Sequence, residues 1–285
     1  MRNSPVANRT REAEQTARQA ATSPLMVMLA RLGYAVKGIL YVIIGILAGL
    51  LGFGHGGSAT DQRGALGAIT ALPFGKFLLG VVTVGLFAFG LWSIIQGIFD
   101  TEGQGKKAKG IIARIGYAAV GVSYIVLGVG ALRVVTGSGS AGQSSTSSTQ
   151  DWTATLLKQP FGQALVVIVG LVVLAIAVYL YMKAYKARFL SSLNLGGLRA
   201  SSRKTIINLG RAGYAALGVV FTIISIFLIV AAVQFDPKKA VGLDGALKEL
   251  LLQPFGPILL VIVALGLIAY GLYSFAEARY RRIGR

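Results

Sequence analysis

Six long runs of apolar residues constrain the fold of this chain more than any other feature. They span residues 32–53, 74–99, 115–136, 162–182, 212–235 and 255–276. Each run holds about 20 residues or more, the length that an α-helix needs to cross roughly 30 Å of hydrocarbon at about 1.5 Å per residue. Transmembrane β-strands would alternate and would be only about 10 residues long. The pattern therefore predicts six membrane-spanning helices.

The composition fits a chain that is solvated mainly by lipid. Hydrophobic residues make up 54% of the 285 residues and charged residues 13%, whereas soluble domains carry about 25% charged residues. The chain has no cysteine, which excludes disulfides and thiolate metal sites. Its net charge of +18 is expected to face an anionic membrane surface rather than nucleic acid.

The distribution of basic residues predicts an orientation. Of the 28 lysines and arginines, 21 lie in the segments on one side of the predicted helices and 7 on the other. Because short loops rich in basic residues stay in the cytoplasm, we expect both termini there. Residues 1–29 are expected to form a polar tail rather than a signal peptide. The low-complexity residues 137–150 are expected to form a flexible extracytoplasmic linker.

Two repeated motifs divide the chain into three units. The first helix of each unit opens with Arg-x-Gly-Tyr-Ala-x-x-Gly, and the second opens with Pro-Phe-Gly, whose proline suits the first helical turn. Nineteen residues after each proline stands an aromatic residue: Trp92, Tyr179 or Tyr273. The repetition predicts three repeats, at residues 30–100, 113–189 and 210–282.

Each repeat contains two helices, so all three enter the membrane in the same direction, unlike inverted repeats. We predict an all-α polytopic membrane protein of three parallel helical hairpins around a pseudo-threefold axis. Glycines allow helix backbones to approach closely in lipid, and we expect the first helices of the repeats to line the axis through such faces. The predicted packing residues are Tyr34, Tyr117, Tyr214, Gly38, Gly121 and Gly218.

On these motifs the chain resembles a bacterial membrane-protein family of unknown function that is built from three tandem two-helix transmembrane repeats. The resemblance covers roughly residues 30–282. It implies the architecture, and it brings no reaction, substrate or cofactor. We expect the protein to lie in the bacterial inner membrane.

Basic residues at the predicted cytoplasmic surface are candidates for contacts with lipid or anions. Arg31, Arg114 and Arg211 begin the three first helices, where they would contact lipid phosphates. A ring of three guanidinium groups that binds an anion or an acidic lipid is the alternative. The loop before the fifth helix adds Arg199, Arg203 and Lys204.

A few polar residues lie inside the predicted spans. Gln96, Lys183 and Glu277 share one repeat position near the cytoplasmic ends of the second helices. We expect solvated helix ends there; the alternative is a polar network with a Lys183–Glu277 pair. Lys37, about two turns into the first helix, is expected to extend its ammonium group to the membrane surface.

No constellation of residues predicts catalysis, a metal site or a cofactor. The single histidine, His55, stands in a glycine-rich loop without further ligands, and no Asp, Glu or His lies at the centre of a predicted span. We expect a non-enzymatic scaffold or accessory subunit that packs with anionic lipids or partner membrane proteins. The alternative is a channel or facilitator for a small solute or anion along the pseudo-threefold axis.

Overall fold

The computed structural model describes residues 24–99 and 108–282, and in these ranges the chain is helical throughout, without a strand. Six helices have the length and apolar composition of membrane spans. They are α2 (Pro24–Gly52), α4 (Gly75–Phe99), α5 (Ala108–Val135), α7 (Gly162–Tyr185), α8 (Ala200–Val233) and α10 (Gly256–Tyr280). The all-α prediction with six spans is confirmed. Most of the predicted tail, residues 1–23, lies outside the described residues.

A short helix follows the first long helix of each repeat. These short helices are α3 (Gln62–Thr70), α6 (Ser145–Leu157) and α9 (Leu243–Leu251). Two 3₁₀ segments complete the fold: η1 (Arg188–Ser192) and η2 (Pro237–Lys239). We call the end of the bundle that carries α3, α6 and α9 the cap end. We call the other end, where α4, α7 and α10 finish, the basic end.

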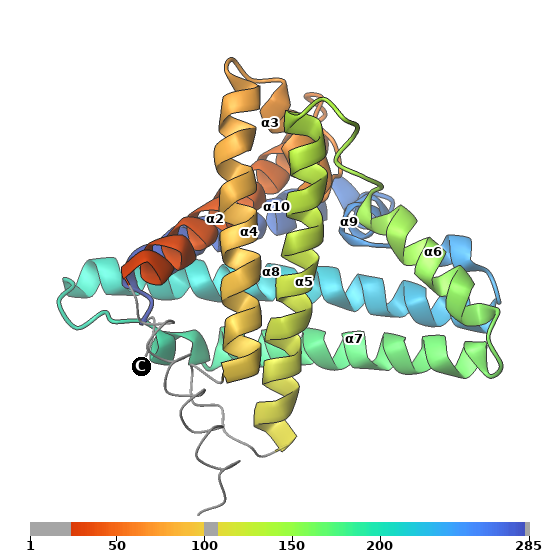
Figure 1. Ribbon diagram of the computed structural model, residues 1–285. Coiled ribbons are helices and arrows are strands. Elements are labelled where there is room, and N and C mark those ends of the chain that lie inside the picture. The colour runs from red at the N-terminus through yellow and green to blue at the C-terminus, as the bar shows by residue number, and fades with distance from the viewer. Residues whose placement is uncertain (1–23, 100–107, 283–285) are drawn as a thin grey trace, which may run out of the picture.

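The long helices pack as a ring in which contacts between repeats exceed contacts within repeats. The second helix of each repeat packs most extensively on the first helix of the next: α4 on α5, α7 on α8, and α10 on α2. Figure 1 shows these pairs running in different directions, with α4 and α5 down the view and α7 and α8 across it. Smaller interfaces join α2 to α4 and α8 to α10. This cyclic order, in which repeat 3 returns to repeat 1, agrees with the predicted pseudo-threefold arrangement.

Glycines allow the paired helices to approach closely. A Cβ atom on Gly38 of α2 would lie 2.8 Å from the carbonyl oxygen of Gly271 on α10, and one on Gly121 of α5 would lie 2.6 Å from that of Gly90 on α4. On α8, a Cβ atom on Gly218 would lie 2.7 Å from the ring of Tyr181 on α7. At Gly38 and Gly121 the opposing atom belongs to the backbone, so no larger residue fits there. Close backbone approach stabilises helix pairs in lipid.

The expectation that the first helices line a common axis differs from the structure. Among the described residues, α2, α5 and α8 share no extensive interface with one another. Their glycines face the second helix of the preceding repeat instead. The physical reason is that close approach needs a small residue on both helices, and the second helices carry matching glycines at Gly90 and Gly271.

The ring lacks one of the interfaces that its symmetry would lead us to expect. The two helices of repeat 2, α5 and α7, share no interface comparable to α2–α4 or α8–α10 in the described part of the chain. In the apolar 18-residue stretch of each helix, only 17% of the residues of α7 and 33% of those of α5 are buried inside the protein, against 56% for α4 and α10. Repeat 2 therefore presents the most surface to its surroundings.

The Pro-Phe-Gly motif forms the same turn in all three repeats. The phenylalanine has a left-handed backbone, with φ of 60° at Phe74, 61° at Phe161 and 59° at Phe255. The glycine amide donates to the carbonyl three residues earlier, as in a type II turn with proline at its second position. Proline thus precedes the helix, and the predicted place in the first helical turn is wrong. Glycine is required because a Cβ atom on Gly256 would lie 1.9 Å from the carbonyl oxygen of Leu251.

The closure of the ring can be tested by disulfide formation, since the chain has no cysteine. A Cβ atom on Gly49 of α2 would lie 3.7 Å from Cβ of Ala264 on α10, inside the range of about 3.5–4.5 Å for disulfides. We expect the double variant Gly49→Cys/Ala264→Cys to form an intramolecular disulfide in membranes under mild oxidation, measured by the loss of thiol labelling.

The control pair for this experiment is Ala119→Cys/Val172→Cys, which places thiols on α5 and α7. We expect both thiols of the control to remain reactive, because that contact is open. Efficient oxidation of the control, or none of the first pair, would contradict the order of helices in the ring.

Candidate functional site

A buried ion-pair cluster lies where repeat 3 meets repeat 1. Glu277 of α10 is 2% exposed, and its Oε2 accepts a hydrogen bond from Lys37 Nζ of α2 at 2.8 Å. Its Oε1 accepts one from Arg281 Nη1 at 2.6 Å. The prediction that Lys37 reaches the membrane surface is wrong: its side chain turns inward and is 8% exposed. A buried charge is costly without such a partner.

Aromatic rings from three helices enclose these charges. Lys37 Nζ lies 5.0 Å from the ring centroids of Tyr34 (α2) and Tyr270 (α10), and 5.5 Å from that of Phe89 (α4). The guanidinium carbon of Arg281 lies 4.8 Å from the centroid of Tyr34. Cation–π attraction strengthens when the cation is desolvated. The cluster therefore joins the hairpin of repeat 1 to the end of repeat 3.

The three residues that share one repeat position lie in different surroundings. Gln96 of α4 is as deeply buried as Glu277, so neither is a solvated helix end. Lys183 of α7 is half-buried, with Nζ 4.2 Å from the ring centroid of Tyr214. All three repeats thus contribute polar groups to the interior of the basic end.

The loop between α7 and α8 closes the basic end. Phe189 of η1 is buried, with its ring centroid 5.4 Å from that of Tyr214 and 5.0 Å from that of Tyr273. The loop is fixed to the end of α10, where the amide of Asn194 donates to the carbonyl of Tyr280 at 2.8 Å. Nothing in the sequence pattern predicted this insertion, because Phe189 belongs to no repeated motif.

The predicted lipid-contacting arginines are not equivalent. Arg31 and Arg211 are exposed. Arg114 is half-buried, and it donates from Nε to the carbonyl of Gly97 at 2.8 Å and from Nη2 to that of Ile98 at 2.6 Å. It thereby stabilises the last turn of α4, where a cation is favourable. The other candidates are exposed at the start of α8: Arg199, Arg203 and Lys204.

A hydrogen-bond network ties the three short helices together at the cap end. The carboxylate of Asp61, which caps α3, accepts from the amides of Gly64 at 3.0 Å and Ser145 at 2.5 Å. The Oδ1 atom of Asp244 in α9 accepts from Ser145 Oγ at 2.7 Å, Thr146 N at 2.9 Å and Thr146 Oγ1 at 2.8 Å. The first turn of α6 is therefore bound to both α3 and α9.

The predicted flexible linker, residues 137–150, differs from this finding over its second half. From Ser145 onward it is helical and carries the network just described. Arg63 Nη1 donates to the carbonyls of Gln143 and Ser144 and to Ser148 Oγ. The serines and threonines that looked like low complexity act here as helix caps and hydrogen-bond donors.

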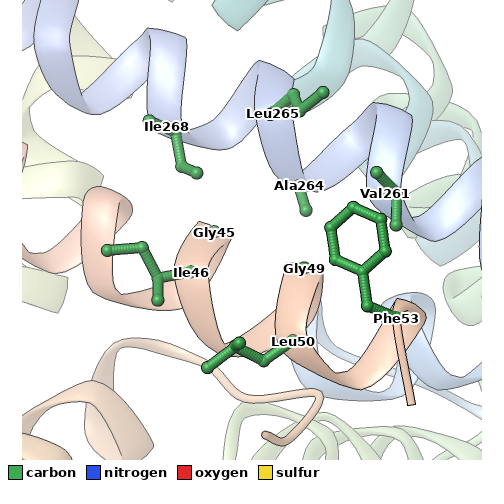
Figure 2. Close-up of a pocket in the computed structure, with 9 residues that line it drawn as sticks. All are labelled: Gly45, Ile46, Gly49, Leu50, Phe53, Val261, Ala264, Leu265 and Ile268. Carbon is green, nitrogen blue, oxygen red and sulfur yellow. The ribbon is translucent and has the colours of Figure 1, made fainter. Parts of the chain in front are cut away.

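A shallow apolar groove of about 190 Å³ lies between α2 and α10. Figure 2 shows aliphatic side chains and the ring of Phe53 around it, with Gly45 and Gly49 at its floor. The groove offers no polar partner to a ligand. In the described ranges, no group of three or more His, Asp or Glu residues could hold a metal ion.

Six apolar spans and three hairpin repeats in cyclic contact define the protein as a multi-pass α-helical membrane protein. The chain belongs to the family Domain of Unknown Function (DUF1206), whose profile matches three times in tandem, at residues 32–100, 115–187 and 212–281. It is 36% identical over 262 residues to the uncharacterized protein YxxB of Bacillus subtilis (strain 168), covering 92% of this chain and 94% of that relative. No solved structure matches the chain. The resemblance inferred from the motifs is confirmed.

The Glu277 cluster predicts a graded loss of stability. We expect Glu277→Gln to lower the free energy of unfolding by roughly 3–5 kcal/mol, because Lys37 and Arg281 would then face a neutral amide. Lys37→Met should cost less, since Arg281 still pairs with the carboxylate. Thermal unfolding of the purified protein in detergent measures both effects.

The control for this series is Lys76→Met, which removes an exposed lysine at the cap end and should change stability by less than about 0.5 kcal/mol. Equal effects of Glu277→Gln and Lys76→Met would contradict a structural role for the buried cluster.

The cap end predicts a loss of stability in acid. Burial acts to raise the pKa of Asp244, but hydrogen bonds from Ser145 and Thr146 outweigh it and hold the pKa below its ordinary value. A carboxyl group with a lowered folded pKa stabilises the fold above its unfolded pKa, and the stabilisation is lost as pH falls through the folded pKa. We therefore expect the melting-temperature difference between the native chain and Asp244→Asn to be constant above about pH 5 and to shrink below about pH 4.

The control is Asp151→Asn, which changes an exposed carboxylate on α6. Melting curves from pH 7 to pH 3 should show no comparable pH-dependent difference for it. A difference for Asp244→Asn that stays constant down to pH 3 would contradict the proposed role of this carboxylate.

Proposed function

We propose that the protein is a non-enzymatic scaffold or accessory subunit of the bacterial inner membrane that packs with anionic lipids or with partner membrane proteins. The observation that carries this proposal is that side chains close the helix bundle at both of its ends. The Glu277 cluster and the Phe189 loop close the basic end, and the Asp61–Ser145–Asp244 network closes the cap end.

The interior between these ends also favours a packing role over a conducting one. It is filled by aliphatic side chains of several helices that form one continuous core, including Leu40, Leu86, Val220 and Leu267, none more than 5% exposed. A hydrated solute would have to displace close-packed side chains and desolvate on the way, both of which cost free energy.

The exposed arginines and lysine at the basic end support an orientation with this end and both termini in the cytoplasm. Arg31, Arg211 and the group at the start of α8 are exposed there. Each basic residue near an anionic surface contributes about 1 kcal/mol of attraction. The proposed lipid partners are therefore anionic.

A channel or facilitator for a small anion is the second candidate. It is favoured by the surplus of cations in the interior of the basic end, where Lys37 and Arg281 both pair with the carboxylate of Glu277. Such a function would require this cluster to open during transport.

Flux measurements on liposomes that contain the full chain separate the two proposals. With chloride, phosphate and glycerol as probes, we expect rates equal to those of protein-free liposomes. A variant in which Arg31, Arg114 and Arg211 are replaced together by glutamine serves as the comparison. Flux through the native protein that this variant abolishes would overturn the scaffold proposal and support the channel.

A further inference from the structure

The phenylalanine of each Pro-Phe-Gly turn combines a strained backbone with an almost fully exposed side chain. Phe74, Phe161 and Phe255 have left-handed backbones, a conformation that is rare for bulky residues and that glycine or asparagine adopts more easily. They are 86%, 87% and 80% exposed. The fold therefore places a bulky residue three times where glycine would cost less, and the phenyl groups gain little contact with the rest of the described chain.

The turn itself does not need these phenyl groups. It is closed by backbone groups alone, because the glycine amide donates to the carbonyl three residues earlier, at 2.8 Å in repeat 1, 2.9 Å in repeat 2 and 2.7 Å in repeat 3. Glycine in place of the phenylalanine would keep this hydrogen bond and would remove the strain. A strained residue that contacts within the chain do not stabilise indicates an interaction outside the chain.

Each of these phenylalanines begins an exposed apolar face of a membrane span. The residues four, seven and ten positions later lie on the same side of the helix, and in all three second helices they are apolar and exposed. They are Leu78, Val81 and Val84 on α4, Leu165, Ile168 and Leu171 on α7, and Leu259, Ile262 and Leu265 on α10. In a membrane span, such a face contacts acyl chains.

Polar and apolar residues are mixed around the turns at the cap end. Lys158, Gln159 and Gln253 are exposed next to the motif prolines, and so are Leu72 and Leu252. This mixture is typical of the boundary between headgroups and acyl chains, where aromatic residues gather and lysine extends its ammonium group towards water. The exposed apolar faces of the spans therefore begin at such a boundary.

The recurrence in three repeats favours lipid as the neighbour of these phenyl groups. The helices that begin after them run in different directions, as Figure 1 shows for α4 and α7. One partner protein at one of these helices would leave the others uncovered. A bilayer surrounds the bundle on all sides, so it can contact all three phenylalanines in the same way.

We propose that Phe74, Phe161 and Phe255 insert into the bilayer at the boundary between headgroups and acyl chains on the cap side, and that together they fix the depth of the bundle in the membrane. This inference goes beyond the proposed packing role, because a scaffold and a channel both need a fixed depth. The flux measurements test the proposed function separately.

Spin labels in the cysteine-free chain measure this depth. The single variants Phe74→Cys, Phe161→Cys and Phe255→Cys carry a nitroxide, and the full chain is reconstituted into liposomes of phosphatidylcholine and phosphatidylglycerol. Power-saturation electron paramagnetic resonance compares collisions with oxygen, which dissolves among acyl chains, and with a nickel chelate, which stays in water. We expect the oxygen-to-nickel ratio to agree within about twofold at the three positions, because all three lie at one boundary.

Two control labels lie on either side of the expected depth. Leu171→Cys, ten residues further along α7, lies up to about 15 Å deeper and should show a ratio about threefold or more above that of residue 161. Ser140→Cys, in the exposed loop after α5, should show a ratio about threefold or more below it.

Replacing all three phenylalanines by glycine tests whether they fix the depth. With the nitroxide at Leu171→Cys, we expect the oxygen-to-nickel ratio to change by about twofold or more, because the bundle loses its contacts with the boundary. The melting temperature in detergent should stay the same or rise, because glycine adopts the left-handed backbone without strain. A triple variant that aggregates is replaced by the three single glycine variants.

The matched control is Phe235→Gly. Phe235 is also exposed and has a φ of 51°, but it belongs to no repeated motif. Its replacement relieves strain in the same way, and it should leave the ratio at residue 171 unchanged.

Ratios at residues 74, 161 and 255 as low as that at residue 140 would place these positions in water and overturn the proposal. Protection of the three labels from both reagents would place a protein partner there instead of lipid. Ratios that differ strongly among the three positions would contradict a common boundary. An unchanged ratio at residue 171 in the glycine variants would show that the phenylalanines do not fix the depth, and a fall in melting temperature would show that they stabilise the fold from within.

Discussion

Close packing of the second helix of one repeat on the first helix of the next is the interaction on which the rest of the structure depends. In lipid there is no hydrophobic drive to bring two apolar helices together, so close packing must hold them. Gly38 on Gly271 and Gly121 on Gly90 provide this packing at successive junctions of the ring. Each repeat therefore packs more extensively on its neighbour than on its own second helix. A single hairpin of this kind would leave its glycine faces uncovered. This explains why three hairpins are joined in one chain and why the third packs on the first.

The junction of repeat 3 with repeat 1 also contains a buried ion pair. Most repeat positions hold similar residues, but Lys37 stands where the other repeats have Val120 and Leu217, and Glu277 stands where they have Gln96 and Lys183. These two deviations form the buried ion pair. A buried pair adds little net stability, yet it disfavours wrong partners strongly, because either charge alone in an apolar junction would be costly. The other two junctions join repeats that follow each other in the chain, whereas Lys37 and Glu277 lie 240 residues apart. We infer that the ion pair selects the correct partner at this junction.

The spans and the repeats could be predicted from the sequence because each is encoded locally, by a run of apolar residues or a motif of fixed spacing. The partners of the glycines could not, because Gly38 and Gly121 mark a close contact without naming the helix that provides it. The depth of Lys37 in its helix favours the membrane surface, whereas its departure from the repeat pattern indicates the pair, because Glu277 departs from the pattern with the opposite charge. The serines and threonines of α6 predict a flexible linker by their composition, because composition does not reveal that Ser145 and Thr146 donate hydrogen bonds to Asp244.

The repeat pattern and its exceptions thus have different roles. Residues that recur three times build the ring and the Pro-Phe-Gly turns, and they would serve the same purpose in any protein of this architecture. Residues that break the pattern make one junction charged, one end hydrogen-bonded and one contact open. Val172 is the clearest case, because a glycine there would allow α5 and α7 to approach as the helices of the other two repeats do. A bulky residue at a position where two repeats require glycine keeps an apolar face exposed that the fold could otherwise have buried. Because three equivalent hairpins would leave no such face, the open contact of repeat 2 follows from residues that break the repeat pattern and not from the pattern itself.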